Sequence, residues 1–108
     1  MAVSGTWTVY YDWGCDGNPG QFTATFNGDG TWSGSGFSGT WVQVSGMLMF
    51  NFKSGPAIYS GNTAGGSMTG MMTTFSDLNG CWWALSQSTA KALAAAETRV
   101  AADGSKKK

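Results

Sequence analysis

Turn sequences that contain glycine recur along this chain at short intervals, and they constrain its fold more than any other feature. Seven of them precede residue 82: Asp16–Gly20, Asn27–Gly30, Ser38–Gly39, Ser45–Gly46, Ser54–Pro56, Ala64–Gly66 and Asp77–Gly80. The runs between them are about six to nine residues long and rich in Thr, Val, Tyr, Phe and Trp, which is typical of strands. The sequence therefore predicts an all-β domain.

These boundaries predict eight strands. Their expected ranges are Thr6–Trp13, Gln21–Asn27, Thr31–Gly36, Thr40–Val44, Met47–Lys53, Ala57–Asn62, Ser67–Phe75 and Cys81–Leu85. Every connection is too short for a crossover to a parallel neighbour, so consecutive strands are expected to pair antiparallel as an up-and-down meander. Closing that meander into a small barrel removes both exposed edges, and a closed barrel is therefore the predicted architecture.

Period-two alternation predicts which side chains face the interior. The inward sets are Trp7, Val9, Tyr11 and Trp13 in the first strand, Phe22, Ala24 and Phe26 in the second, and Leu48, Phe50 and Phe52 in the fifth. By the same reasoning Trp41 and Trp83 point inward and fill the core, whereas Trp82 points out. An outward aromatic residue, with Met47 and Met49 on the outer face, predicts an apolar patch suited to a subunit interface or a flat binding site.

The two cysteines test barrel closure independently. Cys15 follows the first strand and Cys81 begins the last. If these strands pair antiparallel, the end of one lies beside the beginning of the other, so the two thiols meet only in a closed barrel. We expect a disulfide between them, with two unpaired, buried thiols as the alternative. A disulfide requires an oxidising compartment, which predicts a periplasmic or secreted protein.

The composition changes sharply after Leu85. Residues 88–103 are rich in Ala and free of Gly and Pro, with Leu93, Ala96 and Val100 on one stripe, which predicts a helix packed on or beside the barrel. We therefore divide the chain into a barrel domain at 1–87, this C-terminal helix at 88–103, and a disordered basic tail at 104–108.

Charge and residue content argue against several classes of function. The formal net charge is zero and Lys53 is the only cation before the C-terminal segment, so nucleic acid is not an expected partner. No stretch approaches the roughly 20 apolar residues of a membrane-spanning helix. The chain has no histidine, which excludes histidine metal sites and histidine-based catalysis. We expect a non-enzyme without metal or cofactor; the alternative is a carboxylate pair or Ca²⁺ site at Asp12 and Asp16.

The Gly5-Thr6-Trp7 sequence at the start of the first strand resembles the Gly-x-Trp element of the lipocalin and avidin superfamily, the calycins. The eight-strand meander, the C-terminal helix and the Ser-Gly-Thr-Trp sequence at 4–7 and 38–41 strengthen that resemblance. It implies that Trp7 is a structural plug at one end of the barrel, and that the open end takes a small hydrophobic or heterocyclic ligand. Residues 54–59 are also similar to small periplasmic lysozyme inhibitors.

We therefore expect a non-catalytic binding protein that holds a small hydrophobic or aromatic ligand at the barrel mouth. Aromatic side chains would supply the apolar surface and polar ones the hydrogen bonds. The candidate ligand-binding residues are Tyr11, Trp13, Trp32, Asn51, Phe52, Tyr59, Ser60 and Asn62. The alternative is a packed barrel that acts through its outer surface, as a homo-oligomer, a lectin-like domain or an inhibitor of a secreted hydrolase.

Overall fold

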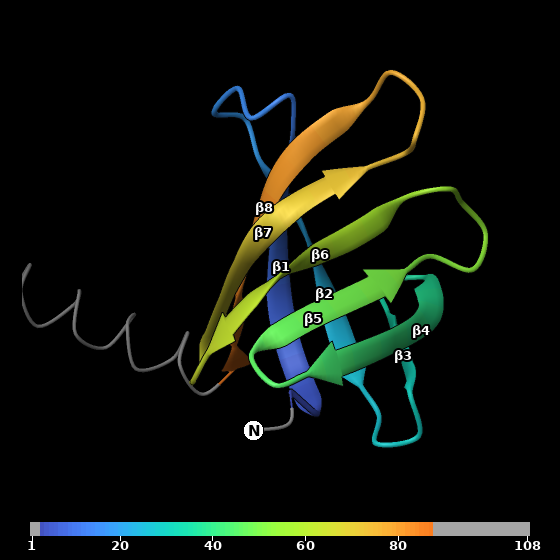
Figure 1. Cartoon of the computed structure of the whole chain (residues 1–108), viewed down its shortest axis with the longest axis vertical. Coiled ribbons are helices and arrows are strands. Elements are labelled where there is room, and N and C mark those ends of the chain that lie inside the picture. The colour runs from blue at the N-terminus through green and yellow to red at the C-terminus, as the bar shows by residue number, and fades with distance from the viewer. Residues whose placement is uncertain (1–2, 88–108) are drawn as a thin grey trace, which may run out of the picture.

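The computed structural model describes residues 3–87 as an eight-strand, closed antiparallel barrel (Figure 1). Each strand pairs with the next in sequence, and β8 pairs back to β1. The strands are β1 (Gly5–Trp13), β2 (Gly20–Phe26), β3 (Thr31–Gly34), β4 (Phe37–Val44), β5 (Met47–Asn51), β6 (Ile58–Ala64), β7 (Ser67–Thr73) and β8 (Asn79–Ser86). The predicted barrel is confirmed, while the helix predicted at 88–103 and the tail at 104–108 lie outside the described residues.

The largest difference from the predicted boundaries is at the start of β4. The strand begins at Phe37 rather than Thr40, so Ser38 and Gly39 belong to a strand and not to a turn. Gly39 pairs with Trp32, and a Cβ there would fall on the carbonyl oxygen of Asn51 and within 2.7 Å of Trp32 Nε1. This glycine is required because two neighbouring strands approach closely.

Aromatic side chains fill the centre of the barrel. The ring of Phe50 meets Trp32 and Trp82 edge to face, with centroids 5.5 Å apart in both pairs. The predicted inward position of Trp41 is confirmed, because its ring packs on Phe26 at 5.7 Å. The largest fully buried side chains are Trp32, Trp82, Phe26, Phe50 and Val9. The inner face of the barrel is therefore a packed core rather than a channel.

The prediction for the Trp82–Trp83 pair is wrong. Trp82 is fully buried, whereas Trp83 is 36% exposed. The pairing of β8 with β1 decides this, because it sets Trp82 opposite the inward Tyr11 and Trp83 opposite the outward Tyr10. The Trp82 indole N–H donates to the carbonyl oxygens of Ser60 and Met71, both at 3.1 Å. Trp83 stacks on Tyr10 outside the barrel, with ring centroids 5.5 Å apart.

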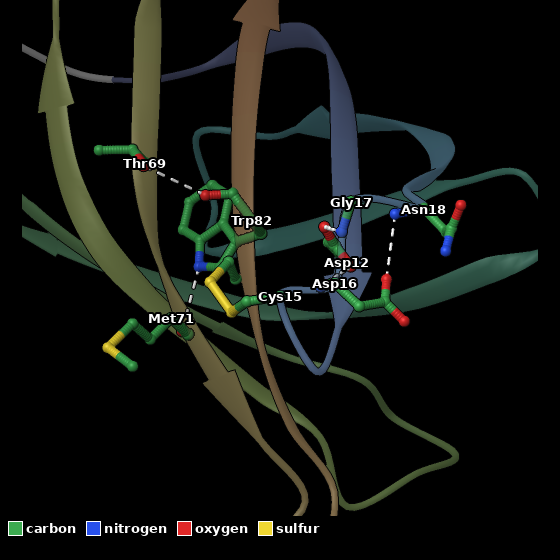
Figure 2. The surroundings of a disulfide bond; sticks show 9 residues. Asp12, Cys15, Asp16, Gly17, Asn18, Thr69, Met71 and Trp82 are labelled. Carbon is green, nitrogen blue, oxygen red and sulfur yellow. Dashed lines mark hydrogen bonds between the residues drawn. A yellow bond between two sulfur atoms is a disulfide. The ribbon is translucent and has the colours of Figure 1, made fainter.

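The predicted disulfide joins Cys15 and Cys81, which are 66 residues apart in the chain (Figure 2). Next to it, the Gly14 N–H donates to the carbonyl oxygen of Asn79 at 2.7 Å. The covalent bond thus lies on the β1–β8 seam, where the barrel closes. A disulfide here is consistent with an oxidising compartment.

Candidate ligand-binding pocket

A pocket opens at the end of the barrel where β1, β3, β5 and β7 finish. Its volume is about 390 Å³, and the connections between β5 and β6 and between β7 and β8 contribute part of its wall. The lining residues are Tyr11, Trp13, Phe22, Phe37, Phe52, Ser54, Gly55, Pro56, Ala57, Tyr59 and Thr74. None of these side chains is charged, so the pocket is suited to an uncharged, mainly apolar molecule.

The floor of the pocket consists of aromatic rings in mutual contact. Phe52 packs edge to face on Trp32 at 5.0 Å and on Phe22 at 5.6 Å, and it meets Tyr59 at 5.3 Å. Phe50 lies beneath, with its ring centroid 4.8 Å from that of Tyr59. Because this layer is continuous with the core, a ligand would rest on the aromatic floor at the mouth and would not enter the barrel centre.

The wall contributed by β1 depends on a glycine in the neighbouring strand. Gly20 pairs with Tyr11, and a Cβ at Gly20 would lie 2.6 Å from the Tyr11 ring. The missing side chain allows the Tyr11 ring to lie across β2, where it also contacts Phe22 at 5.9 Å. The Tyr11 ring is thereby fixed in the pocket wall by its packing on Gly20 and Phe22.

Tyr59 supplies a polar group at the pocket floor. The side chain is almost completely buried, and among residues 3–87 its hydroxyl has no hydrogen-bond partner. Burial raises the pKa of Tyr59 above its ordinary value, and the nearby Tyr11 raises it further. The phenol therefore stays protonated at physiological pH and can donate a hydrogen bond to a bound molecule.

The structure brings together four of the eight predicted ligand-binding residues. Tyr11, Trp13, Phe52 and Tyr59 all line the pocket. Sequence reasoning missed Phe37, the segment from Ser54 to Ala57, and Thr74. The inward position of Phe22 was predicted, and its alternation on β2 was the signal for it, whereas no periodic pattern marks the loop residues.

The other predicted residues lie elsewhere. Trp32 is buried below the floor, where its indole N–H donates to the Asn51 carbonyl oxygen at 2.7 Å. Asn51 uses its side-chain oxygen to accept the backbone N–H of Thr40 at 2.9 Å, and Ser60 and Asn62 are exposed away from the pocket. Trp32 and Asn51 line a second groove of about 540 Å³ over β3, β4 and β5. That groove is larger, but its rim is mostly hydroxyl and amide groups, and it offers no exposed aromatic ring.

Trp7, the predicted plug, lies at the opposite end of the barrel from the pocket. It is 4% exposed, and its indole N–H donates to the carbonyl oxygen of Val3 at 2.7 Å. Its neighbours across the strands are Ala24 in β2 and Ser86 in β8. Trp7 does not line the pocket, and its role as a plug stays a prediction.

Asp12 and Asp16 are engaged with the backbone of the β1–β2 loop (Figure 2). Asp12 accepts the N–H groups of Asp16 at 3.0 Å and Gly17 at 2.9 Å, and Asp16 accepts the N–H of Asn18 at 3.0 Å. Burial raises the pKa of Asp12, but these backbone hydrogen bonds outweigh it and hold the pKa below its ordinary value. Over residues 3–87 no group of three or more Cys, Asp or Glu side chains is placed to hold a metal ion.

Within the described range no helix is long and apolar enough to cross a membrane. The eight-strand closed antiparallel barrel is consistent with the calycin type of architecture in general. No family model matches the chain, and no curated protein is significantly similar to it.

Proposed function

We propose that this protein is a non-catalytic binding protein that holds a small, uncharged, aromatic or hydrophobic molecule in the mouth pocket. The observation that carries this proposal is the aromatic lining of the pocket, in which Tyr11, Trp13 and Phe37 surround a floor closed by packed rings. Sites for small molecules typically occupy about 300–1,000 Å³ and combine apolar walls with a few polar groups. A volume of about 390 Å³ lies in that range.

The resemblance to lipocalins and avidins supports the same proposal, because those proteins hold their ligands at the open end of the barrel. The disulfide supports a periplasmic or secreted location, where such a bond persists. In this reading the aromatic walls supply affinity through burial and ring contacts, and the Tyr59 hydroxyl selects ligands that carry a hydrogen-bond acceptor.

A direct test uses N-phenyl-1-naphthylamine, an uncharged aromatic probe whose fluorescence rises when it leaves water. We expect saturable binding to the full chain, weakened about tenfold or more by Phe37→Ala, since truncating an aromatic anchor that the ligand covers costs more than 1 kcal/mol. Phe75→Ala is the matched control, because Phe75 is also exposed but does not line the pocket.

Two results would contradict the proposal. The first is the absence of any saturable fluorescence increase with the unmodified chain. The second is an equal loss of affinity in both phenylalanine variants, which would place the probe outside the pocket. A second variant, Thr74→Trp, should also weaken binding, because it fills the pocket without removing apolar surface.

A further inference from the structure

The outer surface of the barrel has two chemically different halves. Over the first four strands a row of hydroxyl side chains, each paired with the next across the sheet, consists of Thr6, Thr25, Ser33 and Ser38. Along β4 the outward positions then change from hydroxyl to aliphatic side chains. The strands from β4 to β8 contain no charged residue at all.

The second half carries an exposed group of apolar side chains, which we call the apolar face. Its members are between 36% and 69% exposed: Val42, Val44, Met47, Met49, Met71 and Trp83. Val42 is paired with Met49 and Val44 with Met47, so four of them form one block on the β4–β5 hairpin. Large exposed apolar patches are uncommon on monomers and mark interaction sites.

A polar but uncharged strip on β6 lies between the two apolar groups of this face. Met49 pairs with Ser60, which pairs in turn with Met71. In the next row Asn62 lies between Met47 and Thr69, and Thr69 leads on to Trp83. The face is therefore apolar on both sides of β6 and has hydrogen-bonding groups along the middle. Figure 1 shows the strands that carry it, β4 to β8, in green to orange.

We propose that the apolar face packs against the same face of a second copy of this chain. Its charge pattern favours a second copy over a charged partner, because a charged partner would find no countercharge on β4 to β8. In a two-fold dimer each group meets a copy of the same surface, and a face without charge has nothing that repels itself. The formal net charge of zero also leaves no long-range repulsion between copies.

We place the two-fold axis of this dimer along β6. An axis along β6 would place Ser60 opposite Ser60 of the second copy and set the Val42–Met49 side of one copy on the Met71 side of the other. The strands would then run nearly aligned across the interface, as in packed sheets. A stable interface buries about 800 Å² from each partner, so we expect the whole face to take part. The closed barrel offers no strand edge as an alternative route.

Analytical ultracentrifugation of the full chain from micromolar to millimolar concentration tests this proposal. We expect a monomer–dimer equilibrium whose dissociation constant rises about 100-fold or more in Met47→Lys, because like charges brought together across an interface cost several kcal/mol. Ser33→Lys adds the same charge on the hydroxyl half and should leave the equilibrium unchanged. Thermal unfolding of each variant shows that the barrel is intact.

A cross-linking experiment tests the axis. We expect Ser60→Cys to form a covalent dimer under mild oxidation, with the Cys15–Cys81 bond verified by peptide mapping. Ser33 is an exposed serine of the hydroxyl half, and Ser33→Cys should not form a covalent dimer.

Three results would overturn the proposal: a monomer at every concentration, equal weakening by both lysine variants, or equal cross-linking of both cysteine variants. A chain that stays monomeric but sediments with phosphatidylcholine vesicles would instead assign the face to a lipid surface. Probe binding in the mouth pocket should be unchanged in Met47→Lys, so the two proposals fail separately.

Discussion

The Oδ2 atom of Asp12 accepts a hydrogen bond from the backbone N–H of Gly17 at 2.9 Å, and Oδ1 accepts the N–H of Asp16. Asp12 is on β1 and faces outward, yet it is only 6% exposed because the β1–β2 loop folds over it. The same loop delivers Cys15 to Cys81 on the barrel seam. One carboxylate therefore organises the segment that carries half of the disulfide.

Replacing this carboxylate should lower stability in a pH-dependent way. The pKa of Asp12 lies below its ordinary value of 3.8, so the charged form stabilises the fold, fully above that pH and progressively less as the pH falls through the folded-state pKa. Urea unfolding at neutral pH should show Asp12→Asn to be less stable than the parent chain. This difference in stability between the two chains should become smaller when the pH is well below 3.8, the ordinary pKa of the carboxyl group.

Asp77→Asn is the control, because the Asp77 carboxylate makes no hydrogen bond to any described residue. A pH dependence that is the same in both variants would show that the Asp12 hydrogen bonds do not contribute.

The disulfide should be a major source of stability. A loop of 66 residues corresponds to about 4 kcal/mol in the chain-entropy model. We expect Cys15→Ser, Cys81→Ser and the double variant to lose similar amounts in urea unfolding, because each one breaks the same bond. Adding a reductant should lower the stability of the parent chain to that of the variants and leave the stability of the double variant unchanged. A stability loss confined to one single variant would indicate a packing effect of that residue.

The two adjacent tryptophans should respond very differently to truncation. Trp82→Ala removes a fully buried ring that contacts Phe50 and Tyr59, and a loss of about 3–5 kcal/mol is expected. Trp83→Ala removes a ring stacked on Tyr10 at the surface, and about 1 kcal/mol is expected. Chemical unfolding of dilute protein measures both. Equal losses would contradict the inward and outward assignment.

Glycine at position 39 should be irreplaceable. The Cβ of Gly39→Ala would collide with the Asn51 carbonyl oxygen and approach the Trp32 indole nitrogen, forcing β4 away from β5. We expect a loss of about 2–3 kcal/mol, comparable to an overpacked core. Gly28→Ala is the matched control, since nothing lies within 4 Å of the added methyl group. Thermal unfolding should separate the two, and similar midpoints would show that the strands can adjust.

Much of the fold could be predicted from local sequence. The turn spacing and period-two alternation predicted the eight strands, and the positions of Cys15 and Cys81 predicted which strands close the barrel. Half of the predicted pocket residues line the pocket, and three of them, Tyr11, Trp13 and Phe52, belong to the inward sets near a strand end. Pro56 was missed because the alternation that marks inward residues does not extend into loops. Phe37 was missed because the fourth strand was predicted to begin at Thr40, and the strand begins at Phe37.

The sequence by itself determined the strand number, their antiparallel order and the inward sets of β1, β2 and β5, because each of these follows from spacing along one strand or one turn. Only the tertiary structure decided which of Trp82 and Trp83 is buried. The two alternating sets of residues on β8 both contain apolar side chains, so the choice depends on the register against β1. The tertiary structure also decided that Gly39 lies in a strand and that aromatic rings fill the barrel below the mouth. These depend on how closely distant segments approach, and no local pattern encodes that distance.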